Sequence, residues 1–356
     1  SSAAVSTGQT FTLTTGVDTL NGSGIFSGTV GNADPTITAG DSITGSGTSD
    51  TFAIVSTGTT GTVAGVQLSG VETVRVSDTS TGATTINLAG VTGLELLSSF
   101  GSAHTNTLTF SNVSSITGLQ LSNTSGTGAH TVAYTAATVA GTADAQSITL
   151  DTATNTGVTT IAGVETVAIS ASGQSTIDLA AAAATAVTVA AADATTVTLS
   201  NAANTALSTV TGSGEGAVTY VVDYSLGELA VTGGAGNDVF NISAAAMGAN
   251  DTLDGGDGAA DKLLFASTTD VTTIAGTLAT TTIANVEVLE LQSDDNGGAG
   301  VADFTIDLDT TEGVTSVLLD ANDTNAAAAY ILNDIDATQM GAISMTMVAG
   351  GAGLTL

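Results

Sequence analysis

Apolar and polar residues alternate along short segments of this chain. In one such segment Val74 and Val76 share a face, and Thr73 and Arg75 take the opposite face. A period of two residues is typical of a β-strand, whose successive side chains point to opposite sides of a sheet. Segments of this kind recur about every 10 to 25 residues, with few helix signals between them. The pattern therefore predicts an all-β chain with very little helix.

The strand segments form a unit of four elements that occurs three times in the same order. The first element follows an aspartate: Asp50, Asp144 and Asp261. The second follows a glutamate that comes 22, 21 and 26 residues later: Glu72, Glu165 and Glu287. The third lies at residues 86–88, 177–179 and 306–308, and the fourth at 94–97, 187–189 and 317–319. Such repetition predicts a right-handed parallel β-helix or β-solenoid, which buries its core by stacking turn on turn.

Glycine content suggests how the chain is organised. Residues 211–260 are the richest in glycine, and we expect the junction between two β segments there. Residues 1–210 would form a β-solenoid segment with two repeats. Residues 211–356 would hold glycine-rich turns followed by the third repeat. Short helices are predicted only at residues 243–247 and at 325–340, where a run of alanines has high helix propensity.

The chain is strongly acidic, which narrows the choice of partners. Its formal net charge is −31, from 33 acidic residues against only Arg75 and Lys262. Such a chain should repel nucleic acid and anionic membranes, and it should attract divalent cations that relieve its self-repulsion. Alternatively, the acidity only keeps the chain soluble. No stretch resembles a transmembrane helix, so membrane insertion is not expected.

The remaining composition limits how the chain can be stabilised. Aromatic residues make up 3% of the chain, so the core must consist of small, regular layers. The absence of cysteine means that an exported form could not rely on disulfides. A bound metal is the obvious substitute.

A calcium-binding motif is the clearest chemical signal. Residues 233–241 read GGAGNDVFN, which fits the nonapeptide G-G-x-G-x-D-x-U-x, where U is a large apolar residue. A looser copy at 255–264 has one extra residue before its aspartate. Glycine permits the tight turns, and carbonyl and carboxylate groups supply the hard oxygens that Ca²⁺ prefers. The expected ligand-bearing residues here are Gly233, Gly234, Gly236, Asp238, Asp251, Asp254, Gly255, Gly256, Asp257, Gly258 and Asp261. The alternative is a glycine-rich turn with solvated aspartates.

Two further segments resemble this region. Residues 40–52 align with 251–263, with Asp41 matching Asp251 and Asp50 matching Asp261. Calcium ligands are therefore also expected at Asp41, Gly45, Gly47 and Asp50. A third candidate begins at Asp18, where the next aspartate of the pattern is missing.

Catalytic readings find little support. His104 and His130 are the only histidines, and neither has a Glu-x-x-His arrangement or a cysteine partner. Secreted polysaccharide-cleaving enzymes also use β-helices, and Asp307 and Asp309 could serve as a carboxylate pair. Alternate residues on a strand more often form a solvated ladder, and sugar sites usually carry aromatic and cationic side chains. We therefore expect no enzymatic activity.

Several of these segments together resemble RTX-related surface-layer (S-layer) proteins of Gram-negative bacteria. The similar stretches are residues 11–20, residues 39–43, the two Gly-Val-Glu-Thr-Val segments at 70–74 and 163–167, and the motif at 233–241. The resemblance implies type I secretion and assembly into a lattice on the bacterial cell surface, with calcium inside and between subunits. It also implies anchoring to cell-surface polysaccharide through a domain that these residues do not include.

The expected function is therefore that of a non-enzymatic, extracellular structural protein. It would self-assemble with calcium into a surface layer, lattice or filament. In calcium-poor cytosol its carboxylates would repel one another, and calcium outside the cell would drive folding. An adhesin or biofilm-matrix module is the alternative, and a secreted polysaccharide-active enzyme is a distant one.

Overall fold

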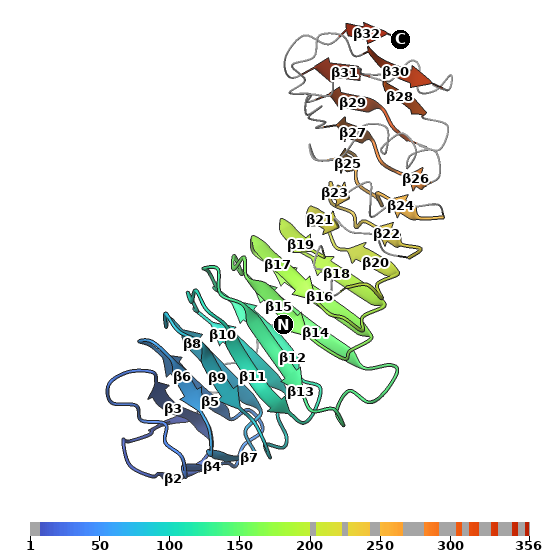
Figure 1. Ribbon diagram of the computed structural model, residues 1–356. Coiled ribbons are helices and arrows are strands. Elements are labelled where there is room, and N and C mark those ends of the chain that lie inside the picture. The colour runs from blue at the N-terminus through green and yellow to red at the C-terminus, as the bar shows by residue number, and fades with distance from the viewer. Residues whose placement is uncertain are drawn as a thin grey trace. The chain divides into compact units, whose positions relative to one another are not determined.

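The chain folds into parallel β-strands that stack as a β-solenoid. The computed structural model describes residues 8–199, 204–222, 227–242, 250–265, 281–291, 304–307, 313–319, 329–333, 344–347 and 353–355. Within these ranges there is no helix, which confirms the predicted all-β class. The chain divides into two compact units, residues 1–184 and 185–356. Within each unit, Figure 1 shows strands of consecutive turns lying side by side.

Three parallel sheets form the first unit. The first sheet has the order β1 (Gln9–Thr12), β3 (Gly24–Val30), β5 (Thr51–Ser56), β8 (Thr73–Asp78), β10 (Leu96–Phe100), β12 (Gly118–Ser122), β14 (Ala145–Asp151) and β16 (Thr166–Ser172). The second sheet contains β6 (Gly61–Val63), β9 (Thr84–Asn87), β11 (Leu108–Val113), β13 (His130–Tyr134), β15 (Val158–Ile161) and β17 (Ser175–Ala180). The third sheet contains β2 (Thr19–Gly22), β4 (Ser42–Gly45) and β7 (Gln67–Ser69).

The second unit repeats this arrangement. Its first sheet contains β18 (Ala186–Ala191), β20 (Thr209–Ser213), β22 (Ala230–Thr232), β24 (Thr252–Asp254) and β26 (Thr282–Ala284). Its second sheet contains β19 (Thr195–Thr198), β21 (Val218–Val222), β23 (Val239–Ile242), β25 (Lys262–Phe265), β27 (Val288–Leu291), β29 (Ser316–Leu319) and β31 (Ser344–Met347). Its third sheet contains β28 (Phe304–Asp307), β30 (Ala329–Asn333) and β32 (Gly353–Thr355).

The core consists of columns of inward-facing apolar residues, one from each turn. Val74 of β8 lies beside Phe52 of β5 and Leu97 of β10 in the parallel ladders. The column runs through residues that are all almost fully buried: Phe26, Phe52, Val74, Leu97, Leu119, Ile148 and Ile169. Strands in a ladder are about 4.8 Å apart, so each side chain packs directly on its equivalent one turn away. Small aliphatic residues are enough to fill the core, because the same contact repeats from turn to turn.

The three sequence repeats are confirmed as structural repeats, since all four elements of each are strands. The residue before each Val-Glu pair adopts a left-handed backbone conformation, with φ of +61° at Gly70 and +83° at Gly163. The third repeat has Asn285 at this place, with φ of +53°. Asparagine is the non-glycine residue that enters this region at least cost, so the substitution preserves the turn.

The predicted helix at 325–340 is wrong where the structure describes it. Ala329 to Asn333 form strand β30, in which Tyr330 pairs with Phe304 and with Leu354. Pairing on both sides outweighs the modest helix propensity of the neighbouring alanines. The helix predicted at 243–247 lies outside the described residues. No helix long and apolar enough to cross a membrane occurs in the described part of the chain.

The compact units divide between residues 184 and 185. The junction between β segments that we expect in residues 211–260 is a separate feature, which this division does not test. Glycine here marks tight turns within the solenoid, such as that of Gly256 with φ of +97°, rather than a linker. The division of the repeats into 1–210 and 211–356 stays a prediction.

We predict that Gly70→Ala destabilises the fold more than Gly93→Ala. Both glycines have positive φ, +61° and +82°, so both variants bear a backbone cost of about 1–2 kcal/mol. A Cβ at Gly70 would also lie 2.5 Å from the carbonyl oxygen of Gly45, whereas one at Gly93 would meet nothing within 4 Å. Urea unfolding should show Gly70→Ala losing at least about 1 kcal/mol more. Equal losses would contradict the close approach of the two turns.

Candidate functional site

Each of the three sequence repeats begins with a Gly-x-x-Asp turn directly before a strand. The turns occupy residues 47–50, 141–144 and 258–261. A Cβ at Gly258 would lie 2.4 Å from both carboxylate oxygens of Asp261, and one at Gly141 would lie 3.0 and 3.1 Å from those of Asp144. A larger side chain would displace the carboxylate. The spacing of glycine and aspartate thus has a steric cause that does not depend on a metal.

The glutamate of each repeat binds the aspartate of the preceding turn. The backbone N–H of Asp50 donates to Glu72 Oε2 at 2.7 Å. The same bond joins Asp144 to Glu165 and Asp261 to Glu287, each at 2.8 Å. In all three pairs the aspartate carbonyl also accepts the backbone N–H of the glutamate and of the next residue. We call these three pairs the Asp–Glu corners. The separations of 22, 21 and 26 residues are therefore single turns of the solenoid.

Asp238, the aspartate of the nonapeptide motif, is fully buried, with 0% of its surface exposed. Its Oδ1 accepts the backbone N–H of Val218 at 2.7 Å, and its Oδ2 accepts that of Gly234 at 2.6 Å. Burial raises the pKa of this carboxyl, and the two amide bonds lower it. The alternative of a solvated aspartate does not apply here. The side chain instead joins its own turn to the preceding one.

Asp41 and Asp50 follow the same pattern, with one amide donor in their own turn and one in the preceding turn. Asp41 accepts from Thr38 at 2.8 Å and from Asp18 at 2.9 Å. Asp50 accepts from Gly47 at 2.7 Å and from Gly24 at 2.6 Å. Both aspartates are fully buried. Gly45 makes room for the second carboxylate, because a Cβ there would lie 2.5 Å from Asp50 Oδ2.

The other predicted ligands are more scattered. The carboxylate of Asp18 accepts from the backbone of Thr14 at 2.7 Å, and Asp251 Oδ1 accepts the N–H of Leu229 at 2.7 Å. Asp254 Oδ1 accepts from the backbone of Gly256 and from the side chain of Asn285. Asp257 is exposed. Calcium binding at these residues, at Asp41, Asp50 and Asp238, and at Gly233, Gly234 and Gly236 stays a prediction.

Asp261 differs from these aspartates because half of its carboxylate has no partner. Its Oδ1 accepts the N–H of Asp238 at 2.6 Å, but its Oδ2 is buried without a hydrogen bond. Burial raises the pKa of this carboxyl to about 6, and the negative charges of Asp238, Glu287 and Asp254 add to the shift. A buried, unpaired carboxylate oxygen is costly. The turn of residues 255–261 would therefore gain from a proton or a cation at Oδ2.

Calcium chemistry fits this turn in part. Carboxylate and backbone carbonyl oxygens are hard ligands, and Asp261 Oδ2 is an oxygen without a donor. Among the residues described, however, no three histidine, aspartate or glutamate side chains form a group that could hold a metal ion. A calcium ion here would depend on backbone carbonyls and water for the remaining oxygens. Asp144 Oδ2 is likewise buried without a hydrogen bond, in the equivalent turn of the second repeat.

The sequence pattern locates the glutamates but does not show what they bind. Glu72, Glu165 and Glu287 precede predicted strands, and Asp144 is not among the expected calcium ligands. The signal was present in the near-constant Asp-to-Glu spacing, which matches one turn of a solenoid. An acidic residue repeated at that spacing indicates a contact between turns.

The two histidines form a buried pair in the first unit. Their Nε2 atoms lie 3.3 Å apart, and His104 and His130 are 1% and 0% exposed. His104 Nδ1 lies 2.6 Å from the carbonyl oxygen of Asn106 and must donate to it. His104 Nε2 is then the acceptor, so His130 Nε2 carries the proton between them. Burial, followed by the neighbouring His104, lowers the pKa of His130 to about 3. His130 therefore serves as a neutral core group at ordinary pH.

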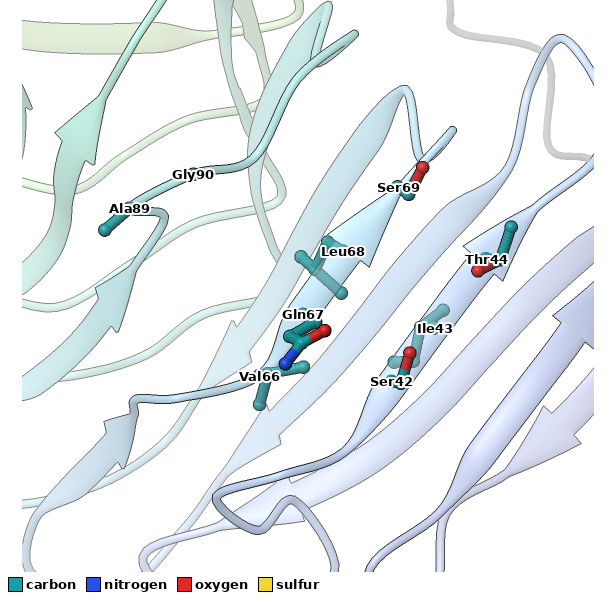
Figure 2. Close-up of a pocket in the computed structure, with 9 residues that line it drawn as sticks. All are labelled: Ser42, Ile43, Thr44, Val66, Gln67, Leu68, Ser69, Ala89 and Gly90. Atoms are coloured by element: carbon teal, nitrogen blue, oxygen red, sulfur yellow. The ribbon is translucent and has the colours of Figure 1, made fainter.

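A shallow pocket of about 380 Å³ lies on the third sheet of the first unit. Figure 2 shows Ser42 and Thr44 on β4, Gln67 and Ser69 on β7, and a turn at residues 89–90 across from them. Its lining is formed by uncharged residues alone. The pocket thus offers hydroxyl and amide groups for hydrogen bonding, without a general acid or base.

Comparison with known proteins gives no family assignment. No protein-family model matches the chain, and no curated protein matches it. The resemblance to RTX-related surface-layer proteins therefore depends on the sequence motifs alone.

We predict that Glu72→Ala destabilises the first unit, whereas Glu95→Ala does not. Removing Glu72 leaves the buried N–H of Asp50 without its acceptor, which costs about 1–3 kcal/mol. Glu95 occupies the same place before β10 but exposes its side chain, so its loss should change stability by less than about 0.5 kcal/mol. Chemical unfolding of both variants measures the difference. Similar effects would show that the Asp–Glu corner adds no stability.

We also predict an acid-dependent contribution from His130. Its folded pKa of about 3 is below the usual 6.5, so the unfolded chain takes up the proton first. The stability due to neutral His130 is complete above pH 6.5 and is lost as the pH falls toward 3. In urea unfolding over this range, His130→Gln should reduce the slope of stability against pH by up to about 1.4 kcal/mol per pH unit. Parallel curves for the two proteins would refute it.

Proposed function

We propose that this chain is a structural module of the bacterial cell exterior that self-assembles, with calcium, into a surface layer, lattice or filament. The observation that carries the proposal is the continuous parallel stacking of turns in both units. Each such sheet ends in an edge strand, as β1 does in the first unit, and edge strands can pair with another chain. Quasi-one-dimensional stacking also yields long, regular surfaces suited to repeated contacts.

The charge of the chain supports a role for calcium. A net charge of −31 opposes both compact folding and the approach of a second copy. Asp261 would hold the ion through Oδ2, with carbonyl oxygens of its own turn, while Glu287 keeps the Asp261 backbone in place. A bound calcium would supply positive charge beside a buried carboxylate. Calcium is abundant outside cells and scarce within them, so this dependence favours an extracellular location.

The pKa of Asp261 determines how the stability contributed by this carboxyl group changes with pH. Its folded pKa of about 6 is above the unfolded value of 3.8, so the folded chain holds the proton more tightly. Stability due to this group is therefore lost as the pH rises from about 4 to about 6, and it stays lost at neutral pH. At neutral pH the carboxyl group has lost its proton, and a cation at Oδ2 would offset the loss of stability.

The pocket in Figure 2 supports a second candidate function, that of an adhesin or biofilm-matrix module. Its side chains at Ser42, Thr44 and Gln67 are uncharged hydrogen-bonding groups, a set that suits a neutral saccharide or an extended peptide. An adhesin or biofilm-matrix module would use such a pocket. It would bind its ligand as a monomer, whereas the first candidate assembles without any other molecule.

Calcium should raise the melting temperature of the wild-type protein by several degrees at neutral pH, and chelator should reverse the change. Asp261→Asn should lose most of this response, because it removes the charge beside the buried oxygen. Asp34→Asn, an acid-to-amide change in an exposed loop, should keep it. Circular dichroism measures the melting, and electron microscopy should show ordered assemblies with calcium and dispersed particles with chelator. Assembly and melting that ignore chelator would refute the calcium dependence.

A further inference from the structure

One face of the first unit has no acidic side chain. Alternate residues of β5, β8, β10 and β12 point away from the core, and none of these outward residues is an aspartate or a glutamate. We call this surface the acid-free face. The outward residues of β6, β9, β11, β13 and β15 in the second sheet are also free of aspartate and glutamate, so the feature particular to the acid-free face is Arg75. Carboxylates lie only at the rim of the face. Glu72 and Glu95 come just before β8 and β10, and Asp151 of the adjacent strand β14 accepts a hydrogen bond from Ser122 of β12 at 3.0 Å.

The centre of the acid-free face carries a cation and an aromatic ring. Arg75 of β8 pairs in register with Ala53 of β5 and Ser98 of β10. Its guanidinium carbon lies 5.6 Å from the centre of the Phe100 ring. Phe100 is 44% exposed, and Val55 on the same face is 40% exposed. These are two of the three large apolar side chains exposed in the described part of the chain.

Arg75 is the only arginine in the sequence, and it has no carboxylate partner among the residues that the structure describes. The single ion pair among the described residues joins Lys262 to Glu290. Two acids lie three residues from Arg75 in sequence. Glu72 uses Oε2 to accept the N–H of Asp50, and Asp78 is buried and accepts the N–H of Ser80. A guanidinium is a planar fork that binds carboxylates through two parallel hydrogen bonds. In so acidic a chain, an unpaired arginine on the outer surface indicates a carboxylate partner from outside.

The composition of the face favours a protein partner. Protein interfaces are enriched in arginine and aromatic residues at their centres and depleted of aspartate and glutamate. Two copies of this chain repel each other through their charges over most of their surfaces. The repulsion is weakest where one copy presents the acid-free face, because that face has a positive charge at its centre. A second copy can also supply the carboxylate in abundance.

We propose that the acid-free face docks onto a carboxylate-bearing surface of a second copy of this chain, with Arg75 donating to a carboxylate of that copy. The proposal rests on the proposed self-assembly and names one of its contacts. The two surfaces differ, so the contact is head-to-tail. Contacts of this kind leave a free surface of each type at the ends and produce open rows of molecules.

The test compares variants of the face with a matched control. Arg75→Gln removes the positive charge, and Phe100→Ser removes the ring beneath it. Ser170→Glu changes the net charge by the same amount as Arg75→Gln, but on β16, two strands beyond the face. Arg75→Lys keeps the charge and loses the planar fork. All three residues point outward, so the fold of the four variants should persist, and circular dichroism checks that it does.

Sedimentation velocity in calcium should give the concentration at which each protein begins to assemble. We expect Arg75→Gln and Phe100→Ser to raise that concentration about tenfold or more, which corresponds to about 1.4 kcal/mol. Arg75→Lys should fall between them and the wild type, and Ser170→Glu should match the wild type within about twofold. Should Arg75→Gln fail to fold, Val55→Ser probes the same face without touching a charge.

The outcomes distinguish the proposed contact at the acid-free face from the proposed self-assembly. If the wild type and both face variants assemble at the same concentration, self-assembly stands and the acid-free face is not its contact. If the wild type never assembles in calcium, both ideas fail. If the wild type stays monomeric but binds an acidic polysaccharide such as polygalacturonate, and Arg75→Gln abolishes that binding, the occupant is a saccharide and the second copy is excluded.

Discussion

The bond between a carboxylate and a backbone amide of the neighbouring turn is the contact on which this solenoid depends. A parallel turn must bring the chain round a corner, where backbone donors leave the ladder and would otherwise be buried without acceptors. At the three Asp–Glu corners the glutamate accepts the N–H of the preceding aspartate. Bonds to an ionised acceptor are about twice as strong as those between neutral groups. With 3% aromatic residues, the core supplies few large side chains to fix the register, so the corners contribute that precision.

The same sequence pattern serves two chemical roles, which is why the fold was easier to predict than the site. Alternation at Val74 and Val76 and the threefold repeat were enough to predict stacked strands, because inward residues must recur once per turn. A Gly-x-x-Asp turn is less informative, since its carboxylate can face a metal or a backbone amide. At Asp50 it faces amides, and at Asp261 one oxygen faces neither. Side-chain direction at a turn depends on the neighbouring turn, whose register the sequence does not specify.

The sequence repeats do not reveal one difference between the units, which is the sheet that contains the strand after the corner aspartate. The strands after Asp50 and Asp144 lie in the first sheet of their unit, whereas the strand after Asp261 lies in the second sheet. The corner contact is the same in all three, so it is a local device that can serve either sheet. The sequence identifies one part of the Asp–Glu corner most directly. This part is the glycine with positive φ, which is replaced by Asn285 in the third repeat.

The position of the acids links the fold to the surface it presents. A corner needs an acceptor, so carboxylates gather just before strands, as Asp50, Glu72 and Asp144 do. The outward residues between corners are then free to be small and uncharged, and the acid-free face is the clearest case. An acidic chain can thus gather carboxylates at the corners while offering a sheet surface without acids and with Arg75 at its centre. The need for a carboxylate acceptor at each corner thus places the acids where they help the turns to stack. It also leaves a sheet surface to which another acidic molecule can bind.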